Sequence, residues 1–201
     1  NNAYQEIQEA LILAKPGDVI RLTAGTFNLQ DSLSLDVNGV QVEGEGMNQT
    51  ILDFTDQQSG AQGLSVTSDN VTLQDFSIQN AKGDAIKVKG VTNIKFLRVK
   101  TEWTDGPKPE NGAYGLYQVE STNVLIDGCV AIGASDAGIY VGQSQNIIVR
   151  NSRSEFNVAG IEIENSYYAD VFNNWLLYIS DAADDSLTVD HCGRHSHNTQ
   201  T

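Results

Sequence analysis

Short runs of alternating hydrophobic and polar residues recur along most of this chain, and an asparagine introduces the clearest of them. These runs begin at Asn70, Asn93, Asn123 and Asn146, at intervals of 23, 30 and 23 residues. Alternation with a period of two is typical of β-strands that have one buried face. A β-rich unit repeated at this length cannot bury its hydrophobic face alone and must stack on its neighbours. The pattern therefore predicts an all-β fold, a β-solenoid in which each repeat forms one coil.

A second alternating run follows each of the first at a nearly constant offset. Its equivalent hydrophobic positions are Ile86, Leu116, Ile139 and Ile161. We expect these side chains to form one ladder inside the solenoid. The next position in each run gives an outward column of Lys87, Tyr117, Tyr140 and Glu162, with about 4.8 Å between neighbouring strands. The four asparagines should likewise stack at a corner, with their amides hydrogen-bonded to one another or to the backbone.

Residues 1–16 follow a helical pattern instead. Ile7, Ala10, Leu11 and Ala14 share one helical face, and Pro16-Gly17 ends the helix. Such a helix would cover the first coil, whose strand edge is otherwise unpaired. We therefore divide the chain into an N-terminal capping helix at 1–16, parallel β-helix coils at 17–173, and a divergent C-terminal tail or cap at 174–201.

Two parts of the sequence resemble known families. The segment "IQEALILAKPGDVIRLTAGTF", followed by the asparagine-led coils, resembles the start of right-handed parallel β-helix proteins of the pectin-lyase-like superfamily. The segments "TEWTDGPKPENGAYGLYQV" and "GASDAGIYVGQSQNIIVRNSRSEFNVAGIEIENS" are similar to an uncharacterised bacterial family of β-helix repeat proteins. The resemblance covers residues 3–173 and implies a right-handed parallel β-helix. It does not imply an activity, because the coils lack the Asp-Pro-His motif of mannuronan epimerases, the paired aspartates of polygalacturonases and the Arg-Pro signature of pectate lyases.

The charge of the chain excludes some partners. Twenty-six acidic and twelve basic residues give a net charge of −14 over 201 residues, which repels nucleic acids and anionic lipid surfaces. An acidic polysaccharide would also be repelled unless a basic patch or a bridging cation intervened. No hydrophobic run approaches the roughly 18 residues needed for membrane insertion. The chain opens at Asn1 with no apolar signal segment, which fits a processed secreted protein or a fragment, so we expect an extracellular or periplasmic location.

The candidate ligand-binding residues lie on the outward column and on an insertion at residues 104–114, "TDGPKPENGAY", which is the longest break in the regular coils. They are Lys87, Asp105, Lys108, Glu110, Tyr117, Tyr140 and Glu162. Loops that project from a rigid scaffold often build binding sites. Aromatic rings beside charged groups can hold the apolar and polar sides of a sugar, which predicts a polysaccharide partner. The alternative is that the tyrosines only stabilise an exposed sheet.

Three functions fit these features. The first is an extracellular scaffold or recognition protein that binds carbohydrate. The second is a lyase or epimerase acting on uronates, with Tyr117, Tyr140 and Lys87 as acid and base. The third is a structural subunit that forms homo-oligomers end to end, because a terminal coil offers unpaired strand edges.

The tail contains the candidate metal ligands. His191, Cys192, His195 and His197 combine imidazole and thiolate, which suits zinc or copper. Asp181, Asp184 and Asp185 offer oxygen ligands for calcium, without the spacing of a known calcium loop. The alternative for both sets is a polar terminal tail with no bound metal.

Other polar and small residues have structural roles in this pattern. Asp75 with Arg98, and Asp127 with Arg150, occupy equivalent offsets in adjacent coils, which predicts ion pairs along a solvated face. Cys129 falls at a hydrophobic position of its coil, and we expect it to be a buried, unreactive side chain.

Overall fold

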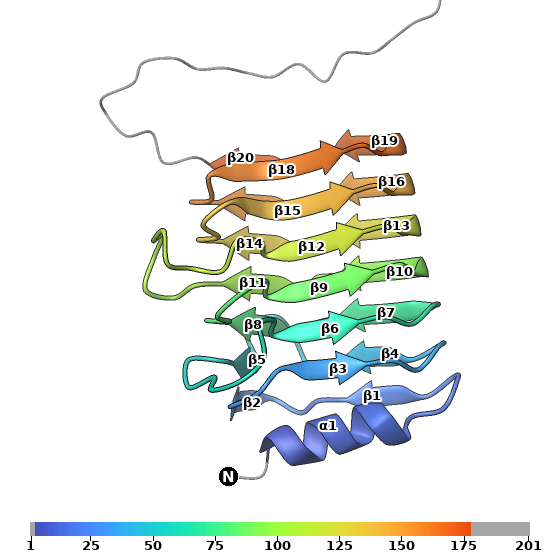
Figure 1. Ribbon diagram of the computed structural model, residues 1–201, viewed down its shortest axis with the longest axis vertical. Coiled ribbons are helices and arrows are strands. Elements are labelled where there is room, and N and C mark those ends of the chain that lie inside the picture. The colour runs from blue at the N-terminus through green and yellow to red at the C-terminus, as the bar shows by residue number, and fades with distance from the viewer. Residues whose placement is uncertain (1–2, 178–201) are drawn as a thin grey trace, which may run out of the picture.

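In the computed structural model, which describes residues 3–177, the alternating runs become short strands that wind into a parallel β-helix (Figure 1). Each coil contributes one strand to each of three parallel sheets, here named A, B and C. Sheets A and B have seven strands each and sheet C has six. The all-β solenoid predicted from the repeat is confirmed.

Sheet A consists of β1 (Val19–Arg21), β4 (Gln41–Glu43), β7 (Val71–Gln74), β10 (Thr92–Leu97), β13 (Thr122–Asp127), β16 (Gln145–Arg150) and β19 (Tyr167–Phe172). Sheet B consists of β2 (Gly25–Asn28), β5 (Thr50–Asp53), β8 (Ser77–Gln79), β11 (Lys100–Glu102), β14 (Val130–Ile132), β17 (Arg153–Glu155) and β20 (Trp175–Leu177). Sheet C consists of β3 (Leu33–Leu35), β6 (Leu64–Val66), β9 (Ile86–Lys89), β12 (Leu116–Val119), β15 (Ala137–Gly142) and β18 (Ala159–Glu164). The described strands thus continue to Leu177.

The core is a set of hydrophobic ladders that run along the solenoid axis. On sheet C, Leu116 pairs in register with Ile86 on one side and Ile139 on the other, and all three are fully buried. Ile161 continues this ladder and is partly buried. Full burial of a large aliphatic side chain contributes roughly 1.5–3 kcal/mol, so the repeat itself supplies the main driving force for stacking the coils.

The helix α1 (Ala3–Leu13) covers the first coil (Figure 1). Ile7 and Leu11 are buried against the core, as the helical pattern predicted. Ala10 is exposed, which corrects the prediction that it shares the buried face. The Gln8 side chain also donates to the Ser34 carbonyl at 2.9 Å and accepts from the Ser34 N–H at 2.8 Å. The helix therefore satisfies backbone groups of β3 that the sheet edge leaves unpaired.

A ladder of asparagines marks the corner where the chain enters sheet A. Asn93 donates to Asn70 at 2.7 Å, Asn123 to Asn93 at 2.8 Å, and Asn146 to Asn123 at 3.0 Å. All four have positive φ angles between 57° and 61°, a conformation that asparagine tolerates better than most residues. The predicted asparagine stack is confirmed, and its role is to turn the chain in register.

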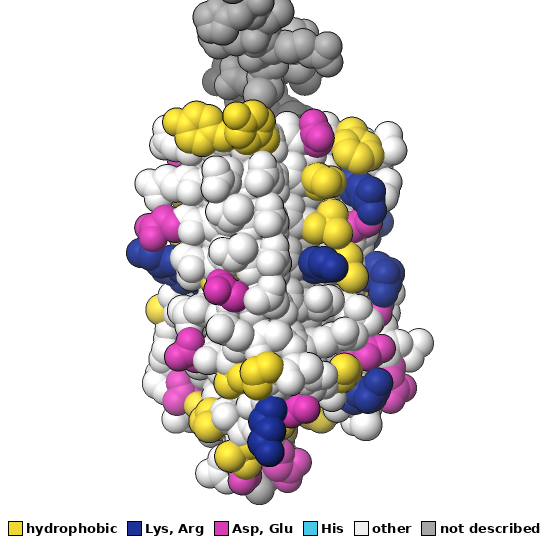
Figure 2. Space-filling model, turned by 90° about the vertical axis from the view of Figure 1, so that its right-hand side faces the viewer, with side chains coloured by type: hydrophobic (Ala, Val, Ile, Leu, Met, Phe, Trp, Pro, Cys, Tyr) yellow, Lys and Arg dark blue, Asp and Glu magenta, His cyan; other side chains and the backbone are white. Residues whose placement is uncertain are grey.

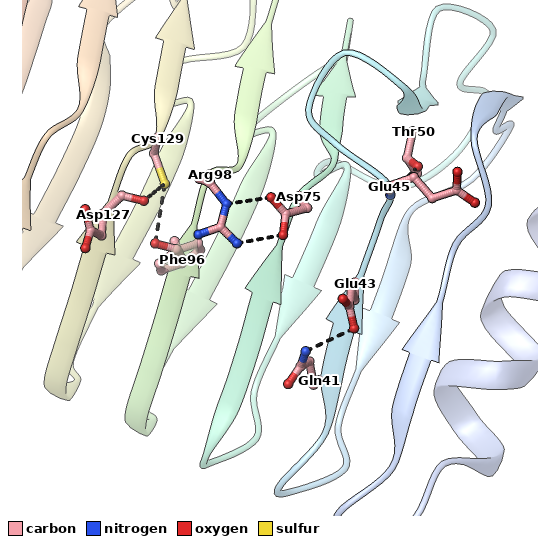
Figure 3. Close-up of polar contacts among 9 residues, drawn as sticks. All are labelled: Gln41, Glu43, Glu45, Thr50, Asp75, Phe96, Arg98, Asp127 and Cys129. Atoms are coloured by element: carbon pink, nitrogen blue, oxygen red, sulfur yellow. Dashed lines mark hydrogen bonds and ion pairs between the residues drawn. The ribbon is translucent and has the colours of Figure 1, made fainter.

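Ion pairs line the next corner, between sheets A and B, and Figure 3 shows the pair of Asp75 and Arg98. Arg98 holds Asp75 through two hydrogen bonds of 2.7 Å, and Arg150 approaches Asp127 to 2.8 Å. Cys129 lies just beyond this corner, fully buried, with its Sγ 3.5 Å from the Phe96 carbonyl oxygen. Burial raises the pKa of the Cys129 thiol to about 12, which keeps it in the unreactive thiol form. The predicted ladder pairs and the buried cysteine are confirmed.

Two long loops leave the solenoid on the same side, between sheets B and C (Figure 1). One contains residues 55–63 and the other is the insertion at residues 104–114. Trp103 anchors the start of the insertion, because its indole N–H donates to the Ala81 carbonyl at 2.8 Å. Asn111 anchors the middle by donating to the carbonyls of Gly106 at 2.9 Å and Gly133 at 2.6 Å. The insertion is thus fixed to the coils on either side of it.

Candidate functional site

The outer face of sheet C carries three tyrosines in contact, here named the tyrosine cluster: Tyr114, Tyr117 and Tyr140. The ring centroids of Tyr117 and Tyr140 lie 5.2 Å apart with the planes inclined by only 13°. Tyr114 lies against both rings, at 4.7 Å from Tyr117 and 5.0 Å from Tyr140. Each of the three is half-buried. Contacts of this kind are worth about 0.5–1.5 kcal/mol beyond the buried area, so the cluster is a rigid feature of the surface.

The solenoid register builds most of this cluster. Tyr117 pairs with Lys87 on β9 and with Tyr140 on β15, and Tyr140 pairs with Glu162 on β18. The outward column predicted from the repeat is therefore present in the structure. Tyr114 comes from the end of the insertion, where its carbonyl accepts from the Ala85 N–H at 2.9 Å.

The column is stacked along the solenoid axis, which determines what the rings can offer to a ligand. The Lys87 ammonium nitrogen lies 5.2 Å from the Tyr117 ring centroid, in range of a cation–π contact. Tyr117 is thus flanked by Lys87 and Tyr140, and presents mainly its edge and hydroxyl outward. Gly142 makes room for Tyr140, because a Cβ atom at that position would lie 2.7 Å from Cε1 of the ring.

Four carboxylates surround the cluster, here named the acidic rim: Asp84, Asp136, Glu162 and Glu164. Glu164 accepts a hydrogen bond of 2.7 Å from the Tyr140 hydroxyl. Burial raises the pKa of Asp84 above its ordinary value, although Lys87 acts in the opposite direction. Burial also raises the pKa of Glu162, and the negative charges of Glu164 and Asp136 add to the effect. Glu162 therefore lies close enough to Glu164 and Asp136 for their like charges to act on it.

The same surroundings keep the tyrosines protonated. Burial and a hydrogen bond to Asp136 raise the pKa of Tyr114 to about 12. The hydrogen bond to Glu164, followed by burial, raises the pKa of Tyr140 well above its ordinary value. Phenols in this state donate hydrogen bonds near neutral pH and are poor proton acceptors.

Three of the predicted ligand residues lie away from the cluster. Asp105 and Lys108 form an ion pair of 3.2 Å with each other on the exposed part of the insertion, and Glu110 is exposed nearby. Within residues 3–177, no hydrogen bond or ion pair links any of the three to the tyrosine cluster. Their role in binding stays a prediction.

Sequence reasoning did not include four residues that the structure adds to the site. Tyr114, Asp84, Asp136 and Glu164 lie outside the repeat positions from which the column was predicted. Glu164 is two residues after Glu162 on the same strand, so alternation along β18 places it on the same face. Strand alternation could have predicted that Glu164 faces the cluster. The positions of Tyr114, Asp84 and Asp136 depend on the conformation of loops, which the repeat does not predict.

A shallow groove of about 700 Å³ follows the outer face of sheet A. Its lining includes Leu125, Ile148 and the asparagine ladder, with Lys95 and Asp170 as charged members. On the side of the solenoid where the chain passes from sheet C to sheet A, the surface is largely uncharged, with hydrophobic and basic side chains gathered along one margin (Figure 2). The asparagine amides in this groove hydrogen-bond to one another along the ladder. This structural role explains why asparagine occurs at these positions without a bound ligand.

The predicted ligands for zinc, copper or calcium lie outside the described residues. They are His191, Cys192, His195, His197, Asp181, Asp184 and Asp185. Within residues 3–177, no three histidine, cysteine or acidic side chains come together in a way that could hold a metal ion. The acidic rim therefore does not have the convergence of a metal site.

Comparison with known proteins establishes the family. A family model described as the right-handed β-helix region matches residues 38–193. The chain belongs to this family. The match agrees with the three parallel sheets of the solenoid and confirms the right-handed parallel β-helix implied by the sequence resemblance. No curated protein matches the chain.

Solved structures with the same fold include several carbohydrate enzymes. An alginate lyase from Paenibacillus sp. str. FPU-7 is 18% identical, with a TM-score of 0.59 over 85% of this chain and 73% of the lyase. The A-module of mannuronan C-5 epimerase AlgE6 from Azotobacter vinelandii is 17% identical, with a TM-score of 0.61 over 87% of this chain and 53% of that one. A pectin methylesterase bound to a hexasaccharide is 14% identical, with a TM-score of 0.51, and the match covers 87% of this chain and 62% of the esterase.

These similarities show the parallel β-helix fold alone, because identity is low. The chain spans little more than half of the epimerase module. Among the described residues, no helix is both long and apolar enough to cross a membrane.

Proposed function

We propose that this β-helix binds carbohydrate through the tyrosine cluster on sheet C, as an extracellular or periplasmic recognition or scaffold protein. The observation that carries the proposal is the contact of three tyrosine rings at 4.7–5.2 Å, with Lys87 and four carboxylates around them. Such a surface combines apolar ring edges with hydroxyl donors and charged acceptors, the mixture that sugar recognition uses.

The scaffold supports this proposal in two ways. Successive coils hold Lys87, Tyr117 and Tyr140 in register, so little conformational entropy is lost when a ligand binds. The solved structures of this fold include an alginate lyase, a mannuronan epimerase and a pectin methylesterase bound to a hexasaccharide. A saccharide chain is therefore a reasonable class of ligand for this face.

Binding is favoured over the lyase or epimerase alternative. Abstraction of a proton next to a uronate carboxylate requires a base, and the raised pKa of Tyr140, one of the residues of that alternative, disfavours its action as the base. Turnover would appear as unsaturated sugar ends or as exchange of the proton at C5, lost in Tyr140→Phe. Detection of either product with the wild-type protein would contradict the proposal of a binding role.

The test is a calorimetric titration of oligosaccharides of defined composition into the full chain. We expect Tyr117→Ala to weaken binding about tenfold or more, which is about 1.4 kcal/mol, because it removes the central ring of the cluster. Tyr140→Phe should weaken binding less than Tyr140→Ala, since it keeps the ring. Tyr167→Ala, at an exposed tyrosine on β19 of sheet A, is the matched control and should bind as the wild type does. Equal binding by Tyr117→Ala and wild type would remove the cluster from the site.

A further inference from the structure

We infer that the tyrosine cluster selects sugars that carry protonated amino groups, such as oligomers of glucosamine, over neutral sugars and uronates. The inference rests on the proposed carbohydrate-binding function and specifies its ligand class. It follows from the carboxylates that lie beside the tyrosine rings and that form no ion pair with any lysine or arginine of the described residues.

Several acidic side chains elsewhere on the coils have basic partners. Glu102 lies 2.6 Å from Lys100, and the Asp75 and Asp127 carboxylates lie 2.7 and 2.8 Å from Arg98 and Arg150. Further pairs join Glu120 to Lys89 and Glu155 to Arg153. On the outer faces and corners of this solenoid, pairing an acid with a neighbouring base is thus a recurrent arrangement.

The acidic rim departs from this arrangement. Within residues 3–177, no lysine or arginine forms an ion pair with Asp84, Asp136, Glu162 or Glu164. Glu164 has a tyrosine hydroxyl as its partner instead. Asp136 and Glu162 are also partly shielded from solvent, so the repulsion of Glu162 by Asp136 and Glu164 is screened less than it would be on an open surface. A cation at this place would relieve that repulsion.

Lys87 shows the kind of group that the cluster accepts. Its ammonium lies against one end of the stack, 5.2 Å from the Tyr117 ring centroid. At the other end, the position after Tyr140 in the column is the carboxylate Glu162, with Glu164 bound to the Tyr140 hydroxyl. An ammonium group of a ligand would find an aromatic ring and two carboxylates there, the combination that favours a cation over a neutral group.

A uronate, which carries negative charge, would be repelled at the face that attracts an ammonium group. Each of its carboxylates would approach four like charges and one lysine, in a protein of net charge −14. Like charges brought together in a partly shielded site disfavour binding. A neutral sugar would gain the contacts with the rings and hydroxyls but nothing from the rim. The order of affinity should therefore be amino sugar, neutral sugar, uronate.

The test compares oligomers of equal length made of glucosamine, N-acetylglucosamine and galacturonate, titrated into the full chain at about pH 6, where amines are protonated and carboxylates largely ionised. We expect the glucosamine oligomer to bind at least about tenfold more tightly than its N-acetylated form. Added salt should reduce this advantage, since the difference is electrostatic.

Neutralising the rim identifies its contribution. The double variant Asp136→Asn with Glu162→Gln should lose most of the preference for glucosamine, so that the ratio of its affinity to that of N-acetylglucosamine falls toward one. Glu120→Gln, at an exposed acid that pairs with Lys89, is the matched control and should keep the preference. Thermal unfolding of each variant checks that the fold is intact.

The outcomes separate this inference from the proposed function. If the N-acetylated or galacturonate oligomer binds as tightly as glucosamine, and Tyr117→Ala weakens that binding, the inference is wrong and the carbohydrate-binding role stands. If none of the three oligomers binds, both are wrong. A preference that survives neutralisation of the rim would also overturn the inference.

Discussion

Gln118 lies at a position of sheet C where the ladder otherwise holds aliphatic residues. Its partners in register are Val88 on β9 and Val141 on β15, and its side chain is fully buried. Within the described residues, neither the amide nitrogen nor the amide oxygen has a hydrogen-bond partner. Burying an unpaired polar group costs about 1–3 kcal/mol, so Gln118 lowers the stability of the coil that carries Tyr117.

We therefore predict that Gln118→Met raises the free energy of unfolding by about 1–3 kcal/mol. Methionine has a similar length and adapts to an irregular core without adding polar atoms. Urea unfolding monitored by circular dichroism measures the change. Gln145→Met, at an exposed position of β16, is the control and should change stability by less than about 0.5 kcal/mol. A destabilised Gln118→Met would show that the amide is satisfied in solution, for example by an internal water.

The tyrosine cluster makes a second prediction at the scale of residues. The pKa of Tyr114 is raised to about 12 and that of Tyr140 is raised further. In the unfolded chain both should titrate near their ordinary value of about 10. The folded state therefore holds these protons more tightly, and its stability is fully present below about pH 10 and falls as pH rises above it.

Phenolate absorbance measures this shift directly. We expect part of the tyrosine absorbance change to occur at higher pH in the folded protein than in urea. The portion that belongs to Tyr140 should be absent from the titration curve of Tyr140→Phe. Tyr168→Phe, at an exposed tyrosine, should leave that part unchanged. Identical titration curves for wild type and Tyr140→Phe would mean that the hydrogen bond to Glu164 does not form in solution.

The repeat allowed the outward column to be predicted, but not every member of the site. Lys87, Tyr117, Tyr140 and Glu162 occupy equivalent offsets, and parallel pairing converts equal offsets into neighbouring positions. Tyr114 reaches the same face through an insertion, where the path of the chain depends on contacts that no periodicity encodes. The unpaired Gln118 shows a further limit, because alternation predicts which way a side chain points and not whether it finds a partner.

At the scale of elements, the insertion at residues 104–114 is the part of the site with the fewest regular contacts. It is held by the Trp103 indole, by the two hydrogen bonds of the Asn111 amide, and by the N–H groups of Ser135 and Asp136, which donate to the carbonyls just before Tyr114. Gly112 is also required, since a Cβ atom there would lie only 1.8 Å from the Gly83 carbonyl oxygen. These anchors determine where Tyr114 lies, although they are remote from its ring.

We predict that Asn111→Ala lowers the free energy of unfolding by about 1–2 kcal/mol, because it leaves two carbonyls without their donor. It should also weaken oligosaccharide binding, since Tyr114 is no longer held against the cluster. Hydrogen exchange followed by mass spectrometry should show faster exchange in residues 104–114 and little change in sheet A.

Asp105→Ala is the matched control for the insertion. It removes an exposed ion pair with Lys108, which is worth little on an open surface. We expect it to leave both stability and exchange near the wild-type values. If Asn111→Ala behaves in the same way as Asp105→Ala, the insertion is positioned by other contacts.

Sequence patterns predicted elements where a period was present. The strands of sheets A and C from β7 to β18 follow from the spacing, whereas the strands of sheet B were not predicted. The N-terminal helix follows from its 3.6-residue pattern and the Pro16-Gly17 stop. The exposed Ala10 shows that a small residue can belong to a helical face in the sequence without contacting the core. Gaps in the repeat predicted the loops at residues 55–63 and 104–114. The hydrogen bonds of Trp103 and Asn111 that anchor the second loop were not predicted.

At the scale of the whole molecule, the two ends of the described solenoid differ. The helix α1 covers the first coil, with Ile7 and Leu11 against the core. The last described coil exposes apolar side chains instead: Val171, Phe172, Trp175, Leu176 and Leu177. Val171 pairs in register with the buried Val149 of the preceding coil, so it belongs to a core ladder that no further described strand continues. A second copy of the chain could extend this ladder.

We accordingly predict that the full chain self-associates through this coil. Light scattering across a concentration series should show the average mass rising with concentration. The net charge of −14 opposes association, so added salt should increase the mass at a given concentration.

Val171→Lys should shift the protein toward monomer, because it places a charge in the contact. Ile148→Lys, at a partly exposed apolar residue on the side of sheet A, should associate as the wild type does. A constant monomer mass at every concentration and salt would exclude assembly and leave the tyrosine cluster as the principal candidate for function, since carbohydrate binding on sheet C does not depend on the ends of the solenoid.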